Sequence, residues 1–174
     1  DRGSLKAKLC VEGNKMMGDL AKELDFHFIR CGKVLVGNTE EDMETLKRTM
    51  EQGKDNGATN LELIDEKRLH ELVPAVVGKF AMFSHNSGIV DPFGYTIALA
   101  ENAHANGVEY HFGCEVTAIR REDDDTYEIT TTKGNFKTRW VVNCAGLGCG
   151  KISDMLGITG YRIIGSKGDY IILD

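Results

Sequence analysis

The segment from Val141 to Gly150 has the clearest chemical potential in the sequence. It reads V-V-N-C-A-G-L-G-C-G, which predicts a strand buried on both faces, a glycine turn and the start of a helix. Such a turn gathers backbone N–H groups at one point, where they bind a phosphate or pyrophosphate, and glycines let that ligand approach closely. The spacing is G-x-G-x-G and not the G-x-G-x-x-G of dinucleotide-binding folds. A tight turn without a ligand is therefore the alternative interpretation.

A second candidate segment runs from Ser87 to Gly94 and reads S-G-I-V-D-P-F-G. Asp91 followed by Pro92 predicts a helix start, because the carboxylate caps free amides and proline has no N–H to satisfy. Helix capping alone explains both residues. His85 lies beside this segment and is the histidine that we consider a functional candidate. Spacing alone assigns no Ser-His-Asp or Cys-His pair, so the catalytic residues stay unknown.

The five cysteines predict no metal site. Their number is odd, no C-x-x-C occurs, and Cys144 and Cys149 have no second pair or nearby histidine to complete a ligand set. Reduced thiols in a cytoplasmic protein are the expectation, with any membrane association arising through the parent protein.

Composition excludes several classes of protein. The chain has 174 residues and a net charge of −6, which allows one ordinary domain with a real core. No Lys/Arg-rich run occurs, which argues against a nucleic-acid surface. No apolar stretch reaches the roughly 20 residues that a membrane-spanning helix needs.

Hydrophobic periodicity predicts an α+β fold with a mixed or antiparallel sheet. The expected helices cover residues 5–24, 39–56, 65–73, 91–106 and 151–156, and the expected strands cover 28–36, 61–64, 80–84, 110–118, 127–131, 136–140, 141–145 and 170–173. Thr39 and Asp65 are the expected N-caps of the second and third helices.

Three blocks, in this order, resemble the FAD-dependent oxidoreductases of the D-amino-acid-oxidase type. They are residues 87–92 with 99–103, residues 116–119 before a β-hairpin, and residues 141–147. Within that family they look most like FAD-dependent glycerol-3-phosphate dehydrogenases and L-2-hydroxyglutarate oxidases. The opening helix and the K-G-D-Y stretch at Lys167 extend the resemblance over nearly the whole chain.

The resemblance implies roles for individual residues. The expected FAD-binding residues are Val116 on the adenine side and Asn143, Cys144, Ala145, Gly146 and Leu147 near the ribose and pyrophosphate. The substrate-side candidates are His85, Ser87, Lys167 and Tyr170. The implied domains are a helical part of the substrate domain over 1–90, part of an FAD/NAD(P)-binding domain over 91–157, and a return to the substrate domain over 158–174.

The chain also departs from the family pattern. It contains no G-x-G-x-x-G turn and no segment that would close over the flavin. We therefore expect an internal fragment that is inactive and binds no FAD alone. In the intact protein the resemblance implies hydride transfer from a small anionic hydroxy compound to flavin, with quinone or oxygen as electron acceptor. Amino-acid or amine oxidation, a non-catalytic binding module and an NAD-dependent Rossmann enzyme are the alternatives.

Overall fold

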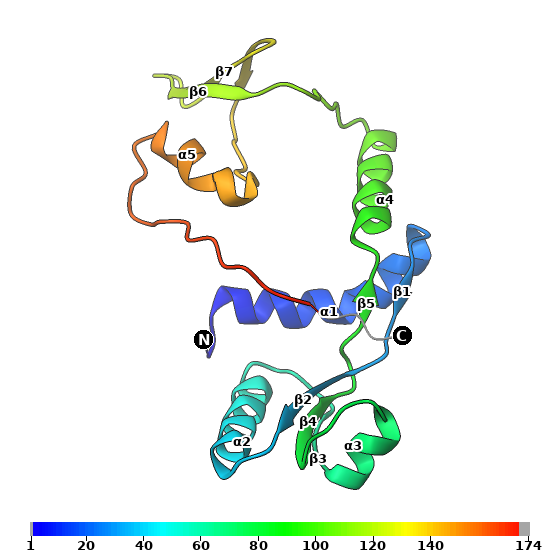
Figure 1. Cartoon of the computed structure of the whole chain (residues 1–174). Coiled ribbons are helices and arrows are strands. Elements are labelled where there is room, and N and C mark those ends of the chain that lie inside the picture. The colour runs from blue at the N-terminus through cyan, green and yellow to red at the C-terminus, as the bar shows by residue number, and fades with distance from the viewer. Residues whose placement is uncertain (1, 171–174) are drawn as a thin grey trace. The chain divides into compact units, whose positions relative to one another are not determined.

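The computed structural model describes residues 2–170 of the chain. They form two compact units, of which the first ends at Glu109 and the second begins at Tyr110. The first unit contains α1 (Leu5–Glu23), β1 (Phe28–Ile29), β2 (Lys33–Gly37), α2 (Glu40–Asp55), β3 (Leu61–Asp65), α3 (Glu66–Leu72), β4 (Phe80–Ser84), β5 (Ile89–Val90) and α4 (Pro92–Ala105) (Figure 1).

One core of the first unit lies where α1 and α4 pack against the small sheet of β1 and β5. Ala21, Phe26 and Ala98 are buried there. The rings of Phe26 and Tyr95 lie with their centroids 4.7 Å apart. Since β5 begins two residues after Ser87 and its Val90 packs against this core, the core anchors one end of the Ser87 segment.

A second core of the first unit forms around the sheet β2-β4-β3, in which β4 is the central strand and pairs antiparallel with both neighbours. Ile64 and Ala81 are paired on one face of the sheet, and Leu69 from α3 packs on them. The opposite face carries Leu61, whose side chain lies beside Gly53 of α2. The two helices therefore cover opposite faces of the sheet (Figure 1).

The helix starts confirm the predicted caps. The Thr39 hydroxyl accepts a hydrogen bond from the Asp42 amide, and the Asp42 carboxylate accepts one from the Thr39 amide, so the capping box is complete. Asp65 caps α3 through the Arg68 amide. Asp91 caps α4, with Pro92 at its first position. These signals are local, because each cap lies within three residues of the amide that it satisfies.

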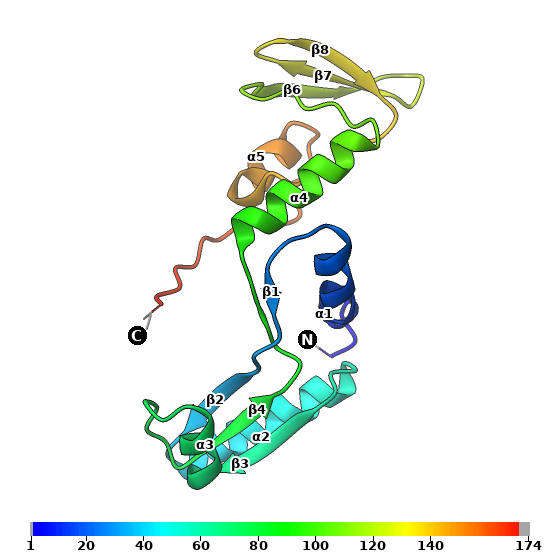
Figure 2. The ribbon, with the colours of Figure 1, turned by 90° about the vertical axis from the view of Figure 1, so that its right-hand side faces the viewer.

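The second unit contains β6 (Val116–Arg121), β7 (Tyr127–Thr131), β8 (Gly134–Thr138), the short 3₁₀ helix η1 (Gly146–Gly148) and α5 (Cys149–Asp154). The three strands form a consecutive antiparallel sheet (Figure 2). Asp125 and Gly134 take positive φ angles of 58° and 130° at the two turns. Helix α5 contacts β6, where Ile119 is buried.

Two predicted strands need correction. Of the strand predicted over 110–118, residues 116–118 are confirmed as part of β6. Residues 110–115 are irregular because Gly113 takes a φ of +60°, which interrupts the alternation of a strand. Residues 141–145 form no strand, and Val142 is 83% exposed. A strand buried on both faces depends on neighbours on both sides, and no strand among residues 2–170 pairs with this segment.

Two further expectations need adjustment. The strand predicted over 28–36 is two strands, because Gly32 takes a φ of +79° between them. The strand predicted over 170–173 falls almost entirely outside the described residues. The α+β class itself, with helices and antiparallel sheets, is confirmed.

Candidate functional site

The glycine turn is a loop that is closed by the side chain of Asn143. Its Nδ2 donates hydrogen bonds to the Cys149 carbonyl oxygen at 2.9 Å and to the Ser153 Oγ at 3.2 Å, and its Oδ1 accepts one from the Ala145 amide at 3.3 Å. The Gly148 amide donates to the Ala145 carbonyl oxygen at 2.9 Å. The loop therefore has a defined backbone shape without belonging to a sheet.

Gly146 lies at the tip of this loop and gives it an open surface. It takes a φ of +56°, and no atom lies within 4 Å of the position that a Cβ would occupy. The neighbouring Leu147 side chain is 79% exposed. Amides in the first turn of a helix have no partner inside it. The loop can thus accept a ligand group that lies directly against its backbone.

Val116 lies in the same unit as this loop, at the start of β6. It pairs with Thr131 of β7, and the register shifts between Val116 and Ala118. The preceding residue, Glu115, forms an ion pair of 3.1 Å with Lys151 of α5. The ion pair connects the start of β6 to the helix that follows the glycine loop, so the structure associates the two predicted FAD-binding segments.

Ser87 belongs to the first unit and lines a cavity of about 190 Å³ there. Its hydroxyl donates a hydrogen bond to the Ser84 hydroxyl at 3.0 Å, and its carbonyl oxygen accepts one from the Gly32 amide at 2.9 Å. The cavity is lined by Cys10, Val11, Asn14, Lys15, Gly57, Ala58, Thr59, Ser84, Asn86 and Ser87. Ser87 is therefore held firmly at the wall of a small cavity.

His85 is engaged on the surface of the sheet. Its Nε2 lies 2.9 Å from Oε2 of Glu62, and its ring centroid lies 4.2 Å from that of Phe83. This arrangement pairs the imidazole with a carboxylate on the neighbouring strand.

Lys167 and Tyr170 lie on an irregular stretch of the second unit. Lys167 forms an ion pair of 2.8 Å with Asp169. The Tyr170 side chain is 93% exposed. Both side chains are therefore accessible to a ligand.

Asn86, next to Ser87, is a positioning candidate that sequence reasoning missed. Its side-chain nitrogen donates a hydrogen bond to the Thr59 backbone carbonyl oxygen at 3.2 Å. Its backbone carbonyl oxygen accepts hydrogen bonds from the side-chain nitrogen of Asn14, at 3.0 Å, and from the guanidinium of Arg30. The signal in the sequence was weak, because these partners come from three separate parts of the chain.

Ser153 is a second residue that sequence reasoning missed. It is only 8% exposed, and its hydroxyl is paired with the Tyr161 hydroxyl as well as with Asn143. Cys149, Ser153 and Leu156 recur at positions i, i+4 and i+7, which places Ser153 on the inward face of the helix. A serine on the apolar face of a predicted helix was the feature of the sequence that could have revealed it.

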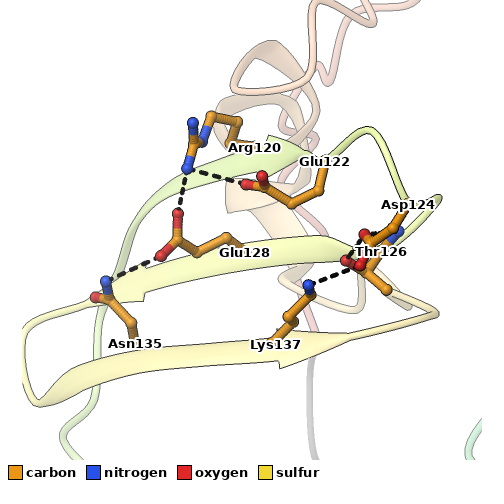
Figure 3. Close-up of polar contacts among 7 residues, drawn as sticks. All are labelled: Arg120, Glu122, Asp124, Thr126, Glu128, Asn135 and Lys137. Atoms are coloured by element: carbon orange, nitrogen blue, oxygen red, sulfur yellow. Dashed lines mark hydrogen bonds and ion pairs between the residues drawn. The ribbon is translucent and has the colours of Figure 1, made fainter.

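The outer face of the β6-β7-β8 sheet carries a network of charges (Figure 3). Arg120 pairs with Glu122 at 3.0 Å and with Glu128 at 2.8 Å. The hydrogen bond from Arg120 lowers the pKa of Glu128. The hydrogen bond from Lys137 lowers the pKa of Asp124 to about 2. Each of these contacts joins charged groups of different strands or of a strand and its turn, and the side chains are exposed, so the contribution of each pair to stability is small.

The part of the chain that the structure describes contains neither a cluster of metal ligands nor a membrane-spanning helix. Between residues 2 and 170, no group of three or more His, Cys, Asp or Glu side chains is placed to hold a metal ion. In the same range, no helix is both long and apolar enough to cross a membrane.

Comparison with known families decides the assignment of the chain. The model of the DAO family, "FAD dependent oxidoreductase", matches residues 1–174. The chain belongs to this family. A glycerol 3-phosphate dehydrogenase from Caloramator mitchellensis is 38% identical over 99% of this chain and 36% of its own length. An L-2-hydroxyglutarate dehydrogenase from Nematostella vectensis is 31% identical over 98% of this chain and 41% of its own length.

The solved structures of two enzymes, a dehydrogenase and an oxidase, share the fold of this chain. An L-proline dehydrogenase from P. horikoshii superposes with a TM-score of 0.81 at 25% identity, over 91% of this chain and 42% of its own. An L-α-glycerophosphate oxidase from Mycoplasma pneumoniae with FAD bound gives 0.79 at 22% identity, over 89% of this chain and 42% of its own. The chain thus spans about two fifths of the length of the relatives that it matches.

The glycine loop has an exposed backbone at Gly146, where nothing beyond the neighbouring residues lies within 4 Å of a Cβ position. This open backbone is compatible with a ligand group that lies against the loop. The match to the family model carries the assignment to the FAD-dependent oxidoreductases.

Proposed function

We propose that this chain works as part of an FAD-dependent dehydrogenase that oxidises the CH–OH group of a small anionic compound, with glycerol 3-phosphate as the first substrate. The observation that carries the proposal is the 38% identity, over 99% of the chain, with a glycerol 3-phosphate dehydrogenase. The substrate is inferred from sequence similarity to a named enzyme, because one fold can serve many substrates.

The chain would contribute residues to both the cofactor site and the substrate site. Backbone groups of residues 143–147, together with Val116, would hold the ribose, pyrophosphate and adenine side of FAD. When bound, FAD supplies the acceptor for the hydride that leaves the substrate carbon. His85, Ser87 and Tyr170 are our candidates for the substrate side, and the Lys167 ammonium would pair with the anionic group of the substrate.

L-2-hydroxyglutarate is the second candidate substrate. It is favoured by the 31% identity with an L-2-hydroxyglutarate dehydrogenase over 98% of the chain. The two compounds share a secondary alcohol beside an anionic group, but one carries a phosphate and the other carries carboxylates. We further propose a cytoplasmic enzyme that passes its electrons to a quinone or to oxygen.

Flavin reduction in the full-length enzyme tests the substrate. The purified enzyme is mixed anaerobically with glycerol 3-phosphate, L-2-hydroxyglutarate, a neutral amino acid or a methylated amine, and flavin absorbance is followed. We expect glycerol 3-phosphate to bleach the flavin at the lowest concentration. Bleaching by the amino acid or the amine alone would show that the proposed substrate class is wrong. Readmitting oxygen or a quinone to the bleached enzyme then identifies the acceptor.

A further inference from the structure

The Asn143 side chain reaches across the loop that it precedes. Its amide nitrogen bonds the carbonyl oxygen of Cys149, at the far end of the loop, while its carbonyl oxygen bonds the amide of Ala145, near the beginning. The identity of the partners fixes the orientation of the side-chain amide, because a carbonyl oxygen only accepts and a backbone amide only donates. One side chain therefore ties both ends of the loop around Gly146.

Asn143 has no N–H group left for a pyrophosphate. Its amide nitrogen carries two N–H groups, and the Cys149 oxygen and the Ser153 Oγ accept them. Phosphate oxygens without protons accept hydrogen bonds and do not donate them, so the remaining Oδ1 cannot bond them. The side chain thus serves the loop and not the pyrophosphate.

Ser153 extends this connection into the interior of the unit. Its side chain is 8% exposed, and its hydroxyl contacts both the Asn143 nitrogen and the Tyr161 hydroxyl. Buried polar groups need their partners, because leaving one unsatisfied is costly. Tyr161 comes from the irregular stretch after α5, so the chain of contacts joins that stretch to the loop.

We propose that Asn143, Ser153 and Tyr161 form a loop lock, a set of positioning residues that holds residues 144–148 ready for FAD. The inference rests on the proposed FAD contact of this loop. A loop that is ordered before binding loses less conformational entropy when the ligand arrives. Breaking the lock should therefore weaken FAD binding, although none of the three side chains needs to contact the pyrophosphate.

The test uses the full-length enzyme with three single variants. FAD dissociation constants are measured by flavin fluorescence, and thermal midpoints are measured without FAD. Asn143→Asp replaces the donor nitrogen by an acceptor and should raise the FAD Kd about tenfold, or about 1.4 kcal/mol. Ser153→Ala should raise it by about fivefold and Tyr161→Phe by about threefold, since each removes one neutral hydrogen bond. Ser166→Ala, at an exposed serine, is the matched control and should change neither quantity.

The double variant Asn143→Asp/Ser153→Ala tests whether the effects of the two residues on the FAD Kd are coupled. If they are, it should bind FAD no more weakly than Asn143→Asp alone, because the lock is already broken. A merely structural role predicts lower thermal midpoints with FAD Kd values within twofold of wild type, and that result would overturn the proposal. A direct FAD contact by Asn143 predicts weaker binding only for Asn143→Asp, which would also overturn it.

The remaining outcomes are equally decisive. If Asn143→Asp does not fold, the Ser153→Ala and Tyr161→Phe variants decide the question by the same two measurements. An enzyme that binds FAD but is bleached by neither hydroxy compound refutes the proposed substrate, while the loop lock is still judged from the FAD Kd values. A full-length wild-type protein that binds no FAD overturns the lock together with the FAD assignment of the loop.

Discussion

Lys137 of β8 donates a hydrogen bond of 2.8 Å to the carboxylate of Asp124, in the turn between β6 and β7. The contact joins the turn between β6 and β7 to β8, at one end of the three-stranded sheet (Figure 3). Thr126 donates to the same carboxylate through its amide, at 3.2 Å, and through its hydroxyl. The turn is therefore held by the Asp124 carboxylate, whose protonation can be changed by lowering the pH.

We predict that the Asp124 pair loses its stabilising effect in acid. The Lys137 hydrogen bond lowers the pKa of Asp124 from 3.8 to about 2 in the folded state. A lowered folded pKa means that the stabilisation is fully present above the unfolded pKa, declines as the pH falls below about 4, and is lost as the pH passes through about 2. Asp124→Asn should therefore unfold more easily than wild type at pH 7, and this difference should shrink as the pH is lowered to 2.

Urea unfolding of the purified protein at several pH values, followed by Trp140 fluorescence, measures this effect. Asp123→Asn makes the same charge change one residue away and is the control. A difference between wild type and Asp124→Asn that stays constant from pH 7 to pH 2 would show that the pair does not titrate in this range.

We predict that Asp91 acts as a helix cap. Its carboxylate accepts hydrogen bonds from the amides of Phe93 at 3.0 Å and Gly94 at 3.1 Å. Asp91→Ala should lower the free energy of unfolding by about 1 kcal/mol, whereas Asp91→Asn, which keeps an acceptor oxygen, should lower it by much less. Urea denaturation measures both. Equal losses for the two variants would mean that the negative charge, and not the cap, is what matters.

We predict that a side chain at Gly146 blocks FAD. In the full-length enzyme, Gly146→Val should raise the FAD Kd tenfold or more, because about 1.4 kcal/mol is tenfold and a clash in a packed site costs roughly 1–3 kcal/mol. The chain offers a matched control in Gly157, which has a similar φ of +69° and equally open surroundings. Gly157→Val imposes the same backbone strain outside the loop.

The comparison of these two glycine variants separates strain from cofactor binding. Both should lower the thermal midpoint, and only Gly146→Val should weaken FAD binding. If Gly146→Val stays folded and binds FAD normally, the glycine is a turn residue and the loop does not contact the cofactor.

We predict that Lys167 contributes to recognition of the anionic substrate. Lys167→Met should raise the KM for glycerol 3-phosphate about tenfold, since a hydrogen bond to a charged group contributes about 1.5–3 kcal/mol. Asp169→Asn should not raise the KM, because it frees Lys167 from its ion pair. Steady-state kinetics of the full-length enzyme, with Lys54→Met of α2 as the control, test both. An unchanged KM for Lys167→Met would leave Lys167 as a surface residue.

The features that the sequence predicted well depend on neighbours close in the chain. The caps at Thr39 and Asp91 need only the amides of the next three residues. The family resemblance, carried by short blocks, likewise led to the correct family.

The features that the sequence predicted poorly depend on distant partners. The apolar run at Val141 resembles a buried strand, but strand pairing requires a neighbour that no local pattern supplies. The contact between Ser153 and Tyr161 joins a helix to a stretch without periodicity. Asn143 was proposed as a cofactor ligand from the resemblance, and only its geometry shows that its N–H groups are already used.

The position of β4 constrains how the first unit is made in the cell. It lies between β2 and β3 although it follows both in the chain. During synthesis, β2 and β3 therefore emerge before the strand that pairs with them, and each presents open edges until Phe80–Ser84 leaves the ribosome. Open edges invite pairing with other chains. Slow translation of residues 66–79 would prolong this exposure, since these residues separate β3 from the strand that covers its edge.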